Sequence, residues 1–143
     1  MTVNGRNNHI VDRAVVSENE SAARRAYERA DYVLCFLLAP ALVEALLRAF
    51  LSRTGRERFD ELIIAYGTYL TGQGQSEPAF VEELTQFNRR RNRVIHNLWK
   101  RGYSATNRTL EPACRATFMT LGLFIEWLET FDPEITEAGF HYD

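Results

Sequence analysis

A nearly continuous apolar run, Val33–Leu51, constrains the fold more than any other part of the sequence. Its length approaches the roughly 20 residues that cross a bilayer as a helix. The run carries Glu44 and Arg48, however, and a charge near the bilayer centre costs about 2.5–3.5 kcal/mol. We therefore expect a soluble chain that folds around this run and has no membrane partner. Pro40 is expected to kink or break the run, which gives two buried helices.

Apolar residues recur at helical spacing along the rest of the chain, and no run alternates as a strand would. A chain of 143 residues suits one domain whose core needs no disulfide or structural metal. The sequence therefore predicts an all-α, single-domain bundle of four to five helices over residues 17–131. We expect residues 1–16 to form a flexible N-terminal segment and residues 132–143 a C-terminal tail.

Capping and breaking residues set the expected helix boundaries. Ser17 followed by Glu20 is a capping-box pattern and predicts the start of the first helix. Ser76 is expected to be an N-cap, and Gly102 is expected to stop the helix that Ser76 opens. The predicted helices run from Ser17 to Pro40, from Pro40 to Ser52, over Arg56–Leu70, from Ser76 to Arg101, and from Glu111 to just before Asp132, with a loop over Tyr103–Thr109.

Cysteine and histidine usage gives no sign of a metal site. Cys35 and Cys114 lie in apolar stretches without CxxC or Cys/His spacing, so both are predicted to be buried core residues rather than ligands or a disulfide. The compartment is then predicted to be the cytoplasm. Two of the three histidines, His9 and His141, fall in predicted tails, so we expect no metal and no cofactor.

The charge is unevenly distributed along the chain. The segment Gln86–Leu110 has seven basic residues and no acid, although the net charge of the chain is −2. The remainder has 10 basic and 19 acidic residues, a net charge of −9. A basic patch on an acidic body favours a localised anionic partner, although a charge run is also typical of a solvated face.

One arginine lies in line with the apolar side of the predicted fourth helix. The stripe of Phe80, Leu84 and Phe87 reaches Arg91 at the same spacing before it continues. A buried guanidinium without a partner is costly, so Arg91 should either pair with an acid, such as Glu44, or open into a cleft. Glu44 could equally pair with Arg48, four residues on. The later members of the stripe are Val94 and Leu98.

The polar residues of this helix gather on another side. At about 100° per residue, Arg89, Asn92 and Arg93 share a face with His96. Arg91 lies about 140° from His96 and so flanks that face. Its long side chain, a bend near Asn97 or two-fold pairing of subunits would bring the two together.

The segment Arg91-Asn92-Arg93-Val94-Ile95-His96 resembles the Rx4–6H motif of the HEPN superfamily, in the form with a polar residue after the arginine. Members of that superfamily are helical bundles that dimerise, and many are metal-independent endoribonucleases that serve as toxins or phage-defence effectors. The resemblance assigns the catalytic positions to Arg91, Asn92 and His96. Some members have a tyrosine two residues after the histidine, where this chain has Leu98. Arg89 and Arg90 also satisfy the spacing to His96, which leaves open the choice of arginine.

The resemblance implies that the chain cleaves RNA as a homodimer, with an antitoxin or regulatory protein as a further partner. Histidine suits proton transfer near neutral pH, and arginine donates paired hydrogen bonds to phosphate. Trp99 and Tyr103 are weighed both as base-stacking and as packing residues. The alternatives are a non-catalytic HEPN-like module that binds RNA, a nucleotide or a protein, and an unrelated helical interaction protein. The expected RNA-binding residues are Arg89, Arg90, Arg93, Trp99, Lys100 and Arg101.

Overall fold

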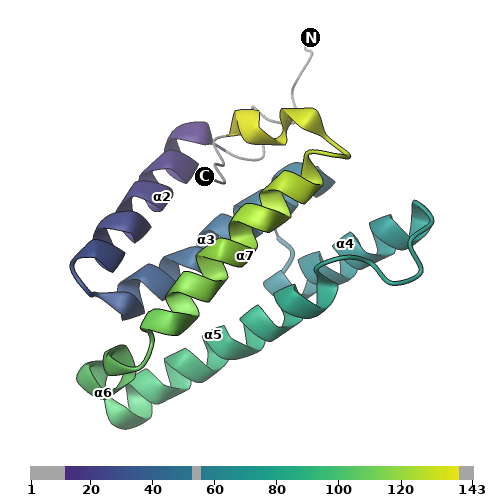
Figure 1. The fold of residues 1–143 in the computed structure, drawn as a ribbon. Coiled ribbons are helices and arrows are strands. Elements are labelled where there is room, and N and C mark those ends of the chain that lie inside the picture. Colours follow the sequence, from purple (N-terminus) through teal and green to yellow (C-terminus); the bar gives the residue numbers. More distant parts are fainter. Residues whose placement is uncertain (1–11, 53–55, 139–143) are drawn as a thin grey trace.

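Helix α3, Tyr32–Leu51, lies at the centre of the fold in this computed structural model, which describes residues 12–52 and 56–138. It contacts every other helix of the described chain (Figure 1). Those ranges contain no strand, so the predicted all-α bundle is confirmed, with six α-helices in place of four or five. The surrounding helices are α2 (Arg13–Glu28), α4 (Phe59–Gly72), α5 (Val81–Arg101), α6 (Tyr103–Arg108), α7 (Glu111–Leu128) and the 3₁₀ helix η1 (Pro133–Ala138).

Helix α3 is also the one helix of the described residues that is long and apolar enough to cross a membrane. Within the fold, 61% of the most apolar 18-residue window of this helix is buried by protein. A core helix of a soluble protein meets the same criteria of length and composition, and burial by five other α-helices is typical of such a helix. The absence of a membrane partner stays a prediction.

The chain breaks before Val33 and not at Pro40, so the predicted boundary there is wrong. Ala30 adopts φ 61°, and the Asp31 side chain accepts a hydrogen bond from the Leu34 amide at 3.3 Å. Asn107 of α6 braces this turn, since its Nδ2 donates to the Ala30 carbonyl and its Oδ1 accepts from the Val33 amide, each at 2.9 Å. Pro40 lies buried inside the continuous α3, where its packing outweighs the lost hydrogen bond.

Three other predicted helix boundaries are wrong. Helix α2 begins at Arg13 because Asp12 caps it, so Ser17 lies inside the helix and the described end of segment 1–16 is helical. Helix α5 begins at Val81, after Phe80 with φ 68°, and not at Ser76. The loop expected over Tyr103–Thr109 is largely helix α6. The predicted stop at Gly102 and the start of α7 at Glu111 are confirmed.

The ends of the chain depart from the expected flexible segments where the structure describes them. Val16 of α2 and Ile135 of η1 are each 2% exposed and belong to the core. Residues 1–11 and 139–143, which make up the rest of the predicted N-terminal segment and C-terminal tail, lie outside the described residues. The folded domain therefore extends beyond the predicted range of 17–131 at both ends.

The core consists of two clusters that share helix α3. The larger cluster joins the second half of α3 to α4, α7 and the start of α5, around Leu46 and Tyr66. The smaller one joins α2 to the first half of α3 and the start of α7, around Phe36. Phe87 of α5 packs against both clusters, with its ring centroid 5.5 Å from that of Phe36 and 6.0 Å from that of Phe59. This contact fixes α5 against the rest of the bundle.

Truncating a buried leucine should lower stability more than truncating an exposed one. Leu46 is 0% exposed and Leu123 is 55% exposed. We expect Leu46→Ala to lower the free energy of unfolding by about 2–5 kcal/mol, because it removes buried methyl groups and leaves a cavity. Leu123→Ala, the matched control, should change it by about 0.5 kcal/mol or less. Urea unfolding followed by circular dichroism measures both, and equal losses would contradict this placement of α3.

Candidate functional site

Helix α5 carries the predicted motif, and its inward stripe anchors it. Leu84 and Val94 are 5% and 4% exposed, and Phe87 and Leu98 are half-buried. Helix α4 packs against α5, and residues of α5 and α7 together line two pockets; Figure 1 shows the three helices. The predicted apolar stripe is therefore confirmed, and the orientation of α5 about its axis follows from it.

Arg91 lies on this stripe, half-buried, and contacts an aromatic ring. Its guanidinium carbon lies 5.6 Å from the centroid of the Phe59 ring, at the start of α4. Its Nη2 donates to Asn92 Oδ1 at 3.4 Å. Its Nε is buried and has no hydrogen-bond partner among the described residues. Arg91 thus has a cation–π contact and a spare donor in place of the acid that an inward arginine usually requires.

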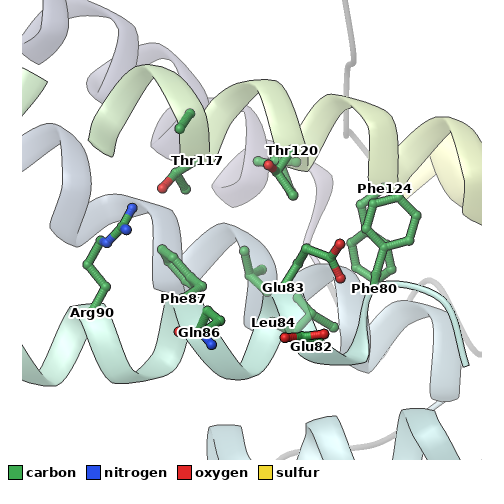
Figure 2. A pocket seen from close by; sticks show the side chains of 13 residues that line it. Phe80, Glu82, Glu83, Leu84, Gln86, Phe87, Arg90, Thr117, Thr120 and Phe124 are labelled. Atoms are coloured by element: carbon green, nitrogen blue, oxygen red, sulfur yellow. The ribbon is translucent and has the colours of Figure 1, made fainter. Parts of the chain in front are cut away.

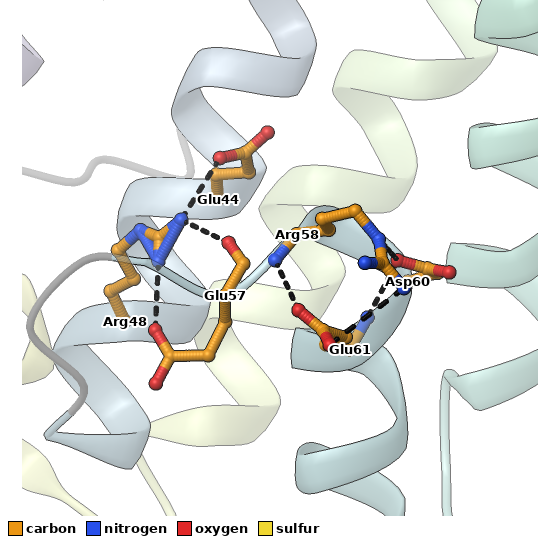
Figure 3. A network of polar contacts seen from close by, with 6 residues as sticks. All are labelled: Glu44, Arg48, Glu57, Arg58, Asp60 and Glu61. Carbon is orange, nitrogen blue, oxygen red and sulfur yellow. Dashed lines mark hydrogen bonds and ion pairs between the residues drawn. The ribbon is translucent and has the colours of Figure 1, made fainter.

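The two alternatives for Glu44 are resolved in favour of Arg48. The Arg48–Glu44 ion pair measures 3.4 Å, and Arg48 also pairs with Glu57 at 3.4 Å (Figure 3). Arg48 Nη2 further donates to the Glu57 carbonyl oxygen at 2.7 Å. The pairing of Arg91 with Glu44 is therefore wrong, because Arg48 is one turn away on the same helix and already has the carboxylate.

An exposed face of α5 lies next to Arg91 along the same helix. We call it the α5 face and define it as Asn92, Ile95, His96 and Trp99, which are all exposed. The His96 and Trp99 rings stack, with centroids 5.6 Å apart and planes at 22°. Trp99 is 81% exposed and Ile95 is 50% exposed, so the packing role weighed for Trp99 is wrong. An imidazole, an amide and a large aromatic ring therefore meet on one open surface.

The predicted RNA-binding arginines do not all share the α5 face. Arg89, Lys100 and Arg101 are exposed. Arg90 and Arg93 line a groove between α5 and the start of α7, together with Asn97. None of these basic side chains has an ion pair with an acid of the described residues. The basic surface therefore continues from the α5 face around the helix toward α7.

Arg90 also lines a second pocket that the sequence did not reveal. This pocket of about 470 Å³ lies between the first half of α5 and α7. Figure 2 shows Glu83 and Arg90 directed from α5 toward Thr117 and Thr120 of α7. Since Arg90 is directed toward α7, it is a weaker candidate than Arg91 for the arginine that works with His96.

Tyr103 makes a structural contact with the turn between α2 and α3. Its hydroxyl donates to Asp31 Oδ1 at 2.8 Å, across the turn between α2 and α3. This hydrogen bond to a carboxylate raises the pKa of the Tyr103 hydroxyl above its ordinary value. The stacking role weighed for Tyr103 therefore competes with an existing structural contact, whereas Trp99 has no such bond.

Asn88 is a neighbour of the motif that sequence reasoning missed. Its Oδ1 is buried without a hydrogen-bond partner among the described residues, one turn before Arg91 and Asn92. Buried polar atoms are normally paired with protein or water, so Asn88 Oδ1 and Arg91 Nε are two exceptions within one turn of α5. The sequence did contain a signal, because Asn88 precedes Arg91 by three residues and Asn92 by four, which places all three side chains close together on a helix.

In the part of the chain that the structure describes, Asn92 of the α5 face accepts a hydrogen bond from Arg91, whereas His96 stacks on Trp99. No contact joins Arg91 to His96 within one chain. Among the described residues, no group of three or more His, Cys, Asp or Glu side chains has the geometry to hold a metal ion. The chemistry available on α5 is thus proton transfer by an imidazole and hydrogen bonding to an anion by a guanidinium and an amide.

Comparisons with known proteins give no further guidance. No family model matches the chain, and neither a curated protein nor a solved structure matches it.

The contact between Arg91 and Phe59 predicts a measurable effect on stability. We expect Arg91→Ala to lower the free energy of unfolding by about 1 kcal/mol, because the cation–π contact and the packing of the methylene stem are lost. Arg93→Ala, two residues away and exposed, should change it by about 0.5 kcal/mol or less. Urea unfolding compares them. An equal effect of both substitutions would show that Arg91 has no special partner.

Proposed function

We propose that the chain is a metal-independent endoribonuclease of the HEPN type, in which Arg91, Asn92 and His96 act on RNA at a cleft between two copies. The observation that carries the proposal is the environment of the Arg91 side chain. Its guanidinium turns inward without an acidic partner among the described residues, and its Nε is unpaired. It donates to Asn92, which is exposed on the same helix as His96. A phosphate oxygen is the natural acceptor for such a donor.

The proposed reaction uses the ribose itself as the nucleophile. One imidazole removes the proton of the 2′-hydroxyl, whose oxygen attacks the adjacent phosphorus, and the 5′-oxygen leaves with a proton. The products are a 2′,3′-cyclic phosphate and a free 5′-hydroxyl. Arg91 stabilises the added negative charge on the phosphorane, and Asn92 positions the phosphate or the ribose. His96 has the exposure needed to reach the substrate.

The proposed homodimer would bring together Arg91 and His96, which do not meet within one chain. Arg91 and His96 have separate contacts in the single chain, with Phe59 and Trp99 respectively. A second copy packed on the α5 face would set the Arg91 of one subunit near the His96 of the other, and would bury Ile95 and part of Trp99. The basic residues around this face would then bind the phosphates that flank the scissile bond. Trp99 is proposed to stack on a base.

The biological setting follows from the resemblance to HEPN proteins. It suggests a toxin or a phage-defence effector in the cytoplasm, held in check by an antitoxin or another regulatory protein. Protection of the α5 face by such a partner would block both the imidazole and the guanidinium.

Cleavage in a chelator tests the enzyme. The purified protein should cut mixed single-stranded RNA in EDTA and leave cyclic phosphate ends. His96→Ala and Arg91→Ala should each reduce the rate by about 100-fold or more, because each removes a group that acts on the transition state. The control Arg25→Ala changes an exposed arginine of α2 and should leave the rate unchanged. RNA that stays intact over a broad pH range at high protein concentration would refute the proposal.

A second candidate is a HEPN-like module that binds RNA, a nucleotide or a protein partner without cutting RNA. The stacking of His96 on Trp99, away from Arg91, favours it, since a stacking platform needs no reacting pair. On this hypothesis the basic residues of α5 bind the backbone, and His96→Ala leaves the RNA affinity nearly unchanged.

Salt dependence measures the contribution of the basic surface in either case. With 2′-O-methyl RNA, which cannot be cut by its own 2′-oxygen, the logarithm of the binding constant should fall linearly with the logarithm of the salt concentration. Arg89→Ala and Lys100→Ala should each reduce the slope by about 0.7, because each removes one phosphate contact to a single strand. Fluorescence anisotropy gives the slopes. An unchanged slope in both variants would remove α5 from the RNA interface.

A further inference from the structure

Helices α5 and α7 flank a pocket that the proposed function does not use. Both helices pack against α3, and they have no extensive contact with each other. The space between them holds the pocket of about 470 Å³ that Arg90 lines, a size typical of small-molecule sites. Its buried apolar lining includes Val43 of α3, Leu84 of α5 and Leu121 of α7, which are 4%, 5% and 6% exposed. The apolar part of a ligand therefore has a surface to pack on.

One end of the pocket has the chemistry to bind a cation. The Phe80 and Phe124 rings lie at this end with their centroids 5.0 Å apart (Figure 2). Glu82 and Glu83 line the pocket next to them along the chain, and neither carboxylate has an ion pair or a hydrogen bond with a described residue. Carboxylates attract an ammonium group, and an aromatic face adds a cation–π contact.

The other end has the chemistry to bind an anion. Arg90 lies two turns after Glu83 on α5, is directed toward α7 and has no ion pair with a described residue (Figure 2). The Thr85 hydroxyl donates to the carbonyl oxygen one turn earlier at 2.8 Å. The hydroxyls of Thr117 and Thr120, which line the pocket, make no such bond with any residue that the structure describes. A guanidinium and two hydroxyls are thus available to a ligand.

The spacing of the charges sets the length of that ligand. Glu83 and Arg90 are seven residues apart. This separation is a rise of about 10.5 Å along an α-helix. Three residues of extended peptide span about 10–11 Å. The free amino and carboxyl groups of a tripeptide therefore match the two charged ends of the pocket, and its peptide groups reach the threonine hydroxyls between them.

We propose that the pocket between α5 and α7 binds a short apolar peptide of about three residues with free ends. Glu82 and Glu83 bind its α-ammonium group, and Arg90 donates paired hydrogen bonds to its α-carboxylate. Thr117 and Thr120 bind its peptide groups, and its side chains pack on the apolar lining. Peptide binding is independent of the proposed RNA cleavage, since none of the three proposed catalytic residues lines the pocket.

Capped peptides test the assignment of the two ends. The probe is the tripeptide Leu-Ala-Leu with free ends, compared with its N-acetyl, C-amide and doubly capped forms in an NMR titration of the full chain. We expect each cap to weaken binding by about tenfold, because it removes the charge that one end of the pocket recognises. The resonances that shift should belong to residues that line the pocket. No binding at millimolar concentration, equal affinity for the free and doubly capped forms, or shifts confined to other surfaces would overturn the proposal.

Substitutions in the protein separate the two ends. Arg90→Gln should weaken binding of the free peptide by about tenfold and leave the affinity for the C-amide form unchanged. Glu82→Gln combined with Glu83→Gln should weaken the free peptide and spare the N-acetyl form. The matched controls Arg25→Gln and Glu18→Gln change exposed residues of α2 and should alter no affinity. Equal losses for free and capped peptides would refute the assigned roles. Circular dichroism checks that each variant is folded, and the capped peptides decide the proposal if one is not.

Discussion

The central position of α3, which packs against every other helix of the described residues, is the constraint on which the rest of the structure depends. Each of the other described helices contacts it, and its fully buried side chains belong to both core clusters. Each large side chain buried there contributes about 1.5–3 kcal/mol, enough together to keep Pro40 inside a continuous helix at a local cost of about 3 kcal/mol. The same packing fixes α5 through Phe87, whose ring lies between Phe36 and Phe59. The positions of Arg91 and His96 therefore follow from the core and not from a loop.

Arg91 is where this packing departs from the ordinary rule for a core stripe. An arginine in such a stripe normally pairs with a carboxylate, because an unpaired buried guanidinium is costly. The candidate acid, Glu44, is held by Arg48, and the Phe59 ring supplies only a cation–π contact. Asn88 Oδ1, one turn earlier, is also buried and unpaired. Departures of this kind concentrate at functional sites, where a local cost is retained because the group acts on something else.

The sequence predicts the fold class well and the helix boundaries less well, for a consistent physical reason. Gly102 and the Glu111-Pro112 pair are local signals, and the structure follows them. The break at Ala30 depends instead on Asn107, which lies on a different helix. Likewise α5 starts late because Phe80 adopts a left-handed conformation beside Ala79, whose carbonyl accepts a hydrogen bond from Tyr66. At the site, helical spacing predicts that Arg91 points inward, but the exposure of Trp99 and the contact of Arg91 with Phe59 depend on the tertiary fold, which spacing does not contain.

Two unfavourable features lie side by side on α5, and the proposed function relieves both at once. One is the buried Nε of Arg91, which has no acceptor among the described residues, and the other is the apolar surface of Ile95 and Trp99, which the described residues leave exposed. A protein partner on the α5 face would cover the apolar surface but leave the guanidinium unpaired unless it also brought an anion. RNA alone would pair the guanidinium and stack on Trp99, yet would leave Ile95 exposed. A second copy of α5 with RNA held between the two subunits would satisfy both, and this is the physical reason why we propose a dimeric cleft.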